Sequence, residues 1–137
     1  MDRLPAAARS KLMSCVRRRD TRPEMVVRRL LHGLGLRFRL QRADLPGRPD
    51  IVLVRRRTAI FVHGCFWHRH RGCGRTTTPA TRREFWLEKF RANRSRDGRN
   101  QRALEALGWR VVVVWECETL AIEQLEARLK ELLCQEG

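Results

Sequence analysis

Residues 50–62 read DIVLVRRRTAIFV, two largely apolar runs joined by three arginines. Short apolar runs that are rich in β-branched residues and bounded by turn signals are typical of buried strands. The short basic link between the two runs predicts a β-hairpin. We expect this hairpin to belong to a sheet, and the rest of the chain is interpreted around it.

Helical patterns and two further strands surround the hairpin. The other predicted elements are, in chain order, a basic helix at 6–19, a helix that begins at the capping box of Thr21 and Glu24, a strand at 36–40, a helix at 81–107 broken near Gly98, a strand at 109–115 and a helix at 120–133. This order predicts an α/β fold with helices on both faces of a sheet. The late strand is expected to run parallel to an earlier one through a helical crossover.

Metal-ligand residues follow the second run of the hairpin directly. Cys65, His70 and Cys73 are spaced as Cys-x4-His-x2-Cys, and Cys117 comes at the end of the next apolar run. Three thiolates and one imidazole form a tetrahedral set that suits structural zinc. The spacing therefore predicts a zinc site that leaves His63 and His68 available for other chemistry.

The composition is strongly basic. Thirty Lys and Arg residues stand against fifteen Asp and Glu, for a net charge of +15, and only Lys11, Lys89 and Lys130 are lysines. The planar guanidinium fork matches phosphate oxygens and guanine edges, which favours nucleic acid as the partner. A solvated basic surface is the alternative, although self-repulsion of this size destabilises a small fold.

The length of 137 residues, 42% of them hydrophobic, fits a single domain over residues 1–137, with the basic helix at 6–19 and a core at 21–134. No apolar stretch approaches the roughly 20 residues that span a bilayer, and the N-terminus lacks a signal-peptide core. We expect a cytoplasmic protein. Five cysteines fit metal binding better than disulfides, with Cys15 and Cys134 as buried thiols.

Asp50, at the start of its strand, is the best candidate in the chain for binding a hard cation. Phosphodiester cleavage uses such a cation, and Mg²⁺ is expected here. Many nucleases carry an acid and a lysine on the next strand, but residues 62–64 read VHG. His63 and His68 can handle the water instead, with Asp97 holding the tautomer. Alternatively, Asp50 is a turn carboxylate and Asp97 a solvated helix carboxylate.

Six motifs together closely resemble the very-short-patch-repair (Vsr) mismatch endonucleases. They are LPGRPD at 45–50, IFVHGCFWH at 60–68, PAT at 79–81, EFWLEK at 84–89, GWRV at 108–111 and WEC at 115–117. The resemblance covers about residues 9–134 in the same order. It implies a restriction-endonuclease-like core of the PD-(D/E)XK type, with a mixed central sheet flanked by helices and a structural zinc.

The same resemblance implies an activity. It is Mg²⁺-dependent nicking of one strand of duplex DNA, 5′ to the thymine of a T·G mismatch, which initiates very short patch repair of deaminated 5-methylcytosine. Two other functions stay open. One is a restriction component that cuts matched, sequence-specific duplex, and the other is a DNA-binding module whose nuclease is inactive.

The resemblance also assigns the metal and its support. It implies that Asp50 and the main-chain carbonyl of Val62 bind Mg²⁺, while His63 and Glu24 support the hydrated ion. Family members commonly have threonine where this chain has Val62, and a main-chain ligand is expected to tolerate valine. Glu24 is most simply the acid of the capping box, and it can face the metal at the same time.

The resemblance further implies that His68 activates the attacking water with Asp97 as its partner. The zinc set that it implies is the one that the spacing predicts: Cys65, His70, Cys73 and Cys117. One more residue separates His70 from Cys73 than the spacing that we associate with the family.

Aromatic side chains beside these histidines could recognise a mismatch. Flat rings such as Phe66, Trp67 and Trp86 can wedge between base pairs, and unstacking costs less at a mispair. The resemblance implies that this wedge enters from the major groove while the N-terminal helix, around Lys11 and Met13, lies across the minor groove. Trp86 could instead belong to the core.

Partners and location follow from the expected activity. Duplex DNA with a T·G mismatch is the expected substrate, mismatch-repair proteins are expected partners, and no membrane is involved. A single-strand nick needs one active site, so a monomer suffices. The expected location is the bacterial cytoplasm, in association with the nucleoid.

Overall fold

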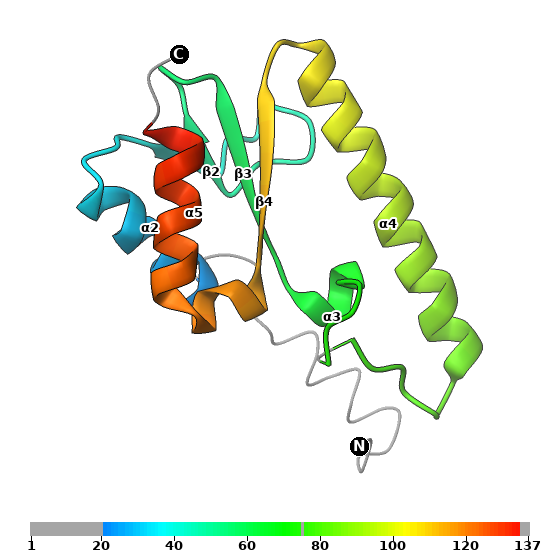
Figure 1. The fold of residues 1–137 in the computed structure, drawn as a ribbon. Helices are drawn as coiled ribbons and strands as arrows, with labels where there is room; N and C mark the ends of the chain where they lie inside the picture. Colours follow the sequence, from blue (N-terminus) through cyan, green and yellow to red (C-terminus); the bar gives the residue numbers. More distant parts are fainter. Residues whose placement is uncertain (1–20, 75, 135–137) are drawn as a thin grey trace.

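The computed structural model describes residues 21–74 and 76–134 (Figure 1). The elements are, in chain order, α2 (Arg22–Gly33), β1 (Arg39–Leu40), β2 (Ile51–Leu53), β3 (Thr58–His63), α3 (Cys65–His68), α4 (Arg83–Ala106), β4 (Arg110–Trp115), the 3₁₀ helix η1 (Glu116–Leu120) and α5 (Ile122–Leu133). The basic helix predicted at 6–19 lies outside the described residues. None of the described helices is long and apolar enough to cross a bilayer.

The sheet of the described residues has four strands in the order β1-β2-β3-β4. β2 pairs antiparallel with both β1 and β3, so the predicted hairpin is confirmed. β3 and β4 pair in parallel, from Thr58 opposite Arg110 to His63 opposite Trp115. The long helix α4 makes the crossover between them, which confirms the predicted parallel pairing in a mixed α/β fold.

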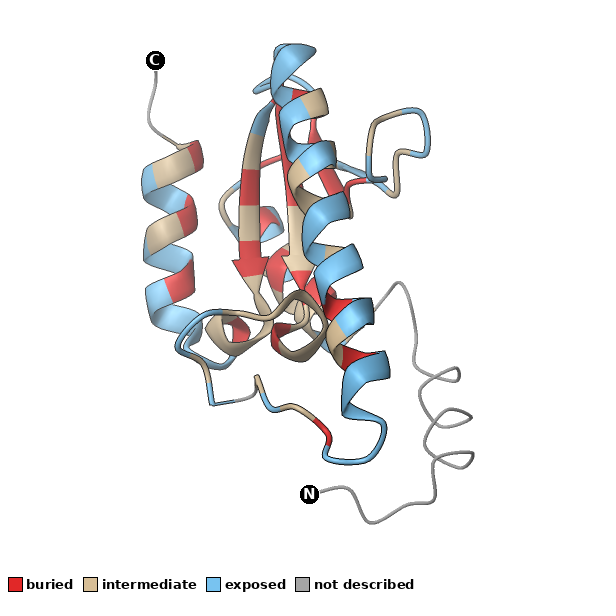
Figure 2. Cartoon of the chain, turned by 90° about the vertical axis from the view of Figure 1, so that its right-hand side faces the viewer, coloured by how far each residue is buried: buried red, intermediate tan, exposed pale blue. Residues whose placement is uncertain are grey.

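Helices cover both faces of the sheet, with α4 on one side and α2 and α5 on the other (Figures 1 and 2). Side chains of a strand point alternately to the two faces, so Ile60 packs toward α2 and α5 while Ala59 packs with Leu104 of α4. Both faces of β2 and β3 are therefore buried, which is why their sequences read as continuous apolar runs.

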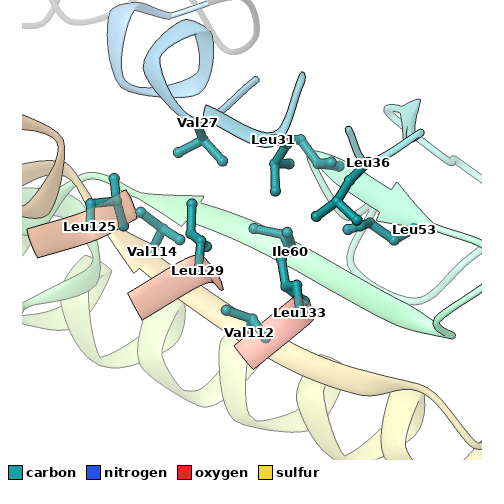
Figure 3. Packing of buried hydrophobic residues seen from close by; sticks show 11 residues of the cluster. Val27, Leu31, Leu36, Leu53, Ile60, Val112, Val114, Leu125, Leu129 and Leu133 are labelled. Atoms are coloured by element: carbon teal, nitrogen blue, oxygen red, sulfur yellow. The ribbon is translucent and has the colours of Figure 1, made fainter. Parts of the chain in front are cut away.

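The larger core lies between the sheet and the two amphipathic helices α2 and α5. Figure 3 shows the side chains of both helices directed at the strands, and the fully buried members include Val27, Leu31, Ile60, Val114, Leu125 and Leu129. In α2 and α5 these residues recur at intervals of four, which places them on one face of each helix.

Two predicted elements differ in extent from the structure. The strand expected at 36–40 is reduced to Arg39–Leu40, because only these residues reach a partner in β2. The predicted break near Gly98 is wrong, because α4 runs without interruption for 24 residues. A single glycine in a helix costs only about 1 kcal/mol relative to alanine, which burial of Trp86, Phe90 and Leu104 along the same helix outweighs.

Alanine substitution should therefore act in opposite directions at two glycines. Gly98→Ala should raise the free energy of unfolding by about 0.5–1 kcal/mol, because the new methyl group meets only the flexible end of Arg102, at 3.3 Å. Gly108→Ala should lower it by about 1–2 kcal/mol, because Gly108 has a φ of +89°. Urea denaturation of both variants measures the difference. A loss of stability in Gly98→Ala would contradict an unstrained, continuous helix.

Candidate active site and metal centre

Asp50 lies at the end of the sheet where β3 finishes. It directly precedes β2, and because β2 runs antiparallel to β3 it comes beside the last residues of that strand. The amide of Val62 donates a hydrogen bond of 2.7 Å to Oδ2 of Asp50. The N–H and C=O groups of one strand residue point to the same edge, so regular strand geometry directs the carbonyl of Val62 toward Asp50 as well.

The surroundings of Asp50 disfavour its charged form when no cation is bound. Burial, with a smaller contribution from the nearby negative charge of Glu24, raises the pKa of Asp50 to about 6, although the hydrogen bond from Val62 acts to lower it. Two carboxyl groups thus lie close together at a buried position. Such an arrangement favours the binding of a cation, which lowers the cost of keeping both groups ionised.

Glu24 caps the start of α2 and also lies close to Asp50. Its backbone amide and that of Thr21 form the predicted capping box, so this part of the sequence analysis is confirmed. The side chain is only 3% exposed. Oε2 accepts from Thr21, while Oε1 accepts from Nε2 of Gln41, at 3.4 Å. The capping geometry therefore fixes an acidic side chain close to Asp50.

Gln41 is a site residue that the sequence analysis missed. Its main-chain amide donates to the carbonyl of Asp50 at 3.2 Å, while its side chain donates to Glu24 and acts to lower the pKa of Asp50. The residue has a left-handed backbone with φ of 51°. Only the pairing of β1 with β2 brings it to the carboxylates, and we find no local motif that could have indicated this role.

The two predicted histidines stack on each other. His63 is the last residue of β3, and His68 is the last residue of α3, which starts two residues later. The ring centroids are 3.8 Å apart and the rings are parallel within 5°. Burial, with a smaller contribution from the charge of His68, lowers the pKa of His63 to about 4, so His63 is neutral near pH 7.

Asp97, from the middle of α4, completes this group. Its Oδ2 lies 2.6 Å from Nδ1 of His68. Burial acts to raise the pKa of Asp97, but the hydrogen bond to His68 and the charges of both histidines and of Arg96 together lower it below its ordinary value. Asp97 is thus an ionised carboxylate that holds one nitrogen of the His68 ring.

An open cavity of about 670 Å³ joins these residues. The predicted residues that line it are Asp50, Val62, His63, Trp67, His68 and Asp97. Arg48, Arg96 and Asn100 also line it and were not identified from the sequence. A larger cavity, of about 900 Å³, lies at the hairpin turn and contains none of the predicted catalytic residues. The candidate catalytic residues therefore share the smaller cavity.

A second group of ligand-type side chains lies beside α3. The ligand atoms of Cys65, His70, Cys73 and Cys117 all lie within 4.8 Å of one another. Nδ1 of His70 is 3.6 Å from Sγ of Cys65 and 3.4 Å from Sγ of Cys117. A tetrahedral ion with Zn–S of about 2.3 Å and Zn–N of about 2.0–2.1 Å separates sulfur and nitrogen by about 3.6 Å. The longer loop between His70 and Cys73 thus does not prevent the set from forming.

The chemistry of this cluster also fits a bound cation. Burial raises the pKa of Cys65 to about 12, and it raises the pKa of Cys117 as well. Thiols in such surroundings ionise when a metal ion accepts the thiolate. Cys134 lies apart from the cluster and packs, partly buried, against the core, while Cys15 lies outside the described residues.

Of the three aromatic residues predicted to form the wedge, Phe66 and Trp67 are partly exposed and Trp86 is buried. Phe66 and Trp67 are adjacent on α3, with ring centroids 5.1 Å apart. Behind them lie Trp86 and Phe90, at 6.1 Å and 5.2 Å from Phe66. Trp86 is only 6% exposed, so it belongs to the core, which was the alternative interpretation, and it offers little surface to a base. Lys11 and Met13 lie outside the described residues.

Comparisons with known proteins place nearly the whole chain among one group of relatives. A family model described as "DNA mismatch endonuclease Vsr" matches residues 1–75. The chain is 54% identical over 132 residues to "Type II nicking enzyme V.XorIIP" of Xanthomonas oryzae pv. oryzae, covering 96% of each chain. It is 52% identical over 136 residues to "DNA mismatch endonuclease Vsr" of Escherichia coli K12, covering 96% of this chain and 86% of the relative.

A more distant relative fits the same pattern. "Type II nicking enzyme V.NmeAIP" of Neisseria meningitidis is 38% identical over 135 residues, covering 96% of each chain. Matches of this extent over nearly the whole chain show common family membership and an endonuclease that acts on DNA. The protein therefore belongs to the Vsr family of DNA mismatch endonucleases.

Proposed function

We propose that this protein is a Mg²⁺-dependent endonuclease that nicks one strand of duplex DNA 5′ to the thymine of a T·G mismatch. It would thereby initiate very short patch repair of deaminated 5-methylcytosine. One observation carries the proposal: a buried carboxylate, Asp50, and a His68–Asp97 pair converge on the same cavity, next to the partly exposed rings of α3.

The acidic side of the cavity suits the metal. Asp50 and the carbonyl of Val62 would hold the ion, and Glu24 and His63 would position water molecules around it. A bound Mg²⁺ supplies charge neutralisation as negative charge develops on the phosphate oxygens. The raised pKa of Asp50, caused by burial and by Glu24, supports a cation at this position.

The histidine side of the cavity suits proton transfer. With its proton on Nδ1, His68 donates to Asp97 and leaves Nε2 as the acceptor for a proton from the attacking water. The carboxylate of Asp97 stabilises the imidazolium that forms. The water then attacks phosphorus, and the 3′ oxygen leaves and takes up a proton from solvent, which yields 5′-phosphate and 3′-hydroxyl ends.

The exposed rings suit recognition of a mismatch. Phe66 and Trp67 stand on the short helix that also carries His68, and Asn93 of α4 donates to the carbonyl of Trp67. Because the two rings stand on the same helix as His68, insertion of the rings at the mispair would also place the phosphate beside this general base. Unstacking costs a few kcal/mol, and less at a mispair, so weakened sites are selected.

The fold supports a restriction-endonuclease-like core of the PD-(D/E)XK type in which histidines replace the second acid and the lysine. We propose that the whole chain forms one nuclease domain and acts as a monomer, since one cavity suffices for a nick. Mismatch-repair proteins remain proposed partners, and its DNA substrate supports the proposed association with the nucleoid.

A second candidate function deserves a separate test. Two of the three relatives described above are named type II nicking enzymes, one of them 54% identical. This chain could therefore nick a sequence-defined duplex that contains no mismatch, as part of a restriction system. Only the preference between matched and mismatched substrates distinguishes the two functions.

Nicking assays on matched and T·G-mismatched duplexes, pooled over flanking sequences, test both candidates. Wild type should nick the thymine strand of the mismatched duplex in Mg²⁺, and Asp50→Ala and His68→Ala should each lower the rate by at least about 10²-fold. Asp44→Ala and His32→Ala, at exposed positions outside the cavity, are the matched controls. Equal cutting of matched duplex would favour the second candidate, and tight binding without nicking would indicate an inactive module.

Without a divalent ion, Asp50→Asn should stabilise the protein. The pKa of Asp50 in the folded state, about 6, lies above its ordinary value of 3.8, so the cost of its ionisation to folding grows from about pH 4 and is complete above about pH 6. The variant should gain up to about 3 kcal/mol at about pH 7.5, and the gain should disappear toward about pH 4. Thermal unfolding over this pH range, with and without Mg²⁺, measures it. Mg²⁺ should stabilise wild type only. A less stable variant at neutral pH would contradict the cost of ionising Asp50, and equal stabilisation of both proteins by Mg²⁺ would contradict the proposed metal position.

Loss of one cluster cysteine should release a structural zinc. Purified wild type should contain about one zinc per chain, and Cys73→Ser should lose it and melt roughly 10 °C lower or more, because metal binding contributes to folding. Cys134→Ser, outside the cluster, should keep the zinc. Elemental analysis combined with thermal unfolding provides the measurement. A wild type that is fully stable and contains no metal would refute the zinc assignment.

A further inference from the structure

A row of aromatic rings connects the cysteine–histidine cluster to the catalytic cavity. The indole of Trp115 stacks on the ring of His70, with centroids 4.2 Å apart and planes within 10°. The same indole meets His63 edge to face at 5.3 Å, and His63 stacks on His68. The order His70, Trp115, His63, His68 therefore runs without a gap from a cluster ligand to the proposed base.

Backbone pairing and hydrogen bonds fix the main chain at Trp115. This tryptophan is the last residue of β4 and lies opposite His63 in the parallel ladder. Its amide donates to Oε1 of Glu118 at 2.9 Å, and Nη1 of Arg128 donates to both oxygens of that carboxylate. Arg128 also donates to the carbonyl of Val113. These bonds connect the end of β4 to α5 and leave the indole little freedom to shift.

The cluster fixes the other side of the indole. Cys117 follows Trp115 by two residues, and its amide donates to Sγ of Cys65 at 3.4 Å. The carbonyl of His70 accepts from Thr76 at 2.7 Å. A metal ion shared by Cys65, His70 and Cys117 would therefore lock the ring on which Trp115 stacks. The indole would then be held between a metal-bound imidazole and the strand that carries His63.

His63 depends on such neighbours for its orientation. In the part of the chain that the structure describes, its ring is positioned by contacts with Phe61, His68 and Trp115 rather than by side-chain hydrogen bonds. His68, in turn, is oriented by Asp97 on one nitrogen and by the stacked His63 ring on one face. If His63 were displaced, the ring of His68 could tilt away from its present orientation.

We propose that Trp115 is a positioning residue that transmits the rigidity of the metal-binding cluster to the His63–His68 pair. The inference rests on the proposed function in taking those histidines as members of the active site. Its consequence is that the cluster does more than stabilise the fold: it sets the orientation of the catalytic imidazoles through one indole. Small displacements of catalytic groups are costly, since a shift of about 1 Å can cost about 10²-fold in rate.

The test uses the full-length protein and two ways of breaking the row of rings. Trp115→Leu removes the aromatic face, and Trp115→Phe restores part of it. His70→Cys keeps four potential ligands for the cluster but removes the ring that stacks on the indole. A cysteine sulfur can take the place of the imidazole because Nδ1, the ring nitrogen nearer the backbone, faces the other ligands. Trp109→Phe is the matched control, because Trp109 is buried against Leu104 and far from these rings in the packing.

Three quantities are measured for each variant: the single-turnover nicking rate with saturating T·G duplex, the dissociation constant for that duplex with Ca²⁺ in place of Mg²⁺, and the zinc content. A fourth is the NMR resonance of the His68 ring protons in the DNA-free protein. His68 is informative because its ring contact is with His63 and not directly with Trp115.

The proposal predicts that Trp115→Leu and His70→Cys keep their zinc and bind DNA within about twofold of wild type, yet nick about tenfold or more slowly with a shifted His68 resonance. Trp115→Phe should be intermediate, and Trp109→Phe should match wild type. The double variant should be no slower than the slower single variant, because both changes break one row.

Unchanged nicking and an unchanged His68 resonance in Trp115→Leu would overturn the proposal. So would a defect that follows loss of zinc, since that result would indicate a purely structural role. If Trp115→Leu does not fold, Trp115→Phe and His70→Cys decide the matter. If wild type nicks no T·G duplex, the proposed function fails, and the His68 resonance then decides the positioning role by itself.

Discussion

β3 and β4 pair in parallel over six residue pairs, and their register places His63 directly opposite Trp115. Both strands end at the same edge of the sheet, so the residues that follow them meet there. Cys65 and α3 continue from β3, while Cys117 continues from β4. Antiparallel β2 starts at this edge and brings Asp50 with it. One register thus gathers the acidic group, the histidines and the cysteine–histidine cluster.

Burial makes the charged forms of these acidic groups unfavourable when no cation is bound. Burial raises the pKa of Asp50, and it raises the pKa of Cys65 and Cys117. Each of these groups would be better solvated in the unfolded chain. The cores on both faces of the sheet provide the stability that offsets this cost, and bound cations would reverse its sign. A site of this kind is stable only in a fold whose remaining contacts are well packed, as the fully buried side chains around Ile60 are.

The aromatic residues show how one composition serves different purposes. Trp86 and Phe90 are buried and support the ring of Phe66 from behind. Trp109 packs in the core on the α4 side of the sheet. Trp115 lies between the histidine pair and the cysteine–histidine cluster. Residue type alone does not separate these roles. Their positions relative to the sheet ends and to α4 decide which rings are accessible to DNA and which hold other residues in place.

The sequence by itself determined the hairpin, the capping box, the late parallel strand and the identity of the ligand-type residues, because each depends on local patterns of period, spacing or turn chemistry. Tertiary structure decided the continuity of α4 through Gly98, the burial of Trp86, the link that Gln41 makes between Glu24 and Asp50, and the row of rings through Trp115. These features arise from contacts between segments that are distant in the chain. Their energies depend on strand register and helix packing, which local sequence signals do not contain.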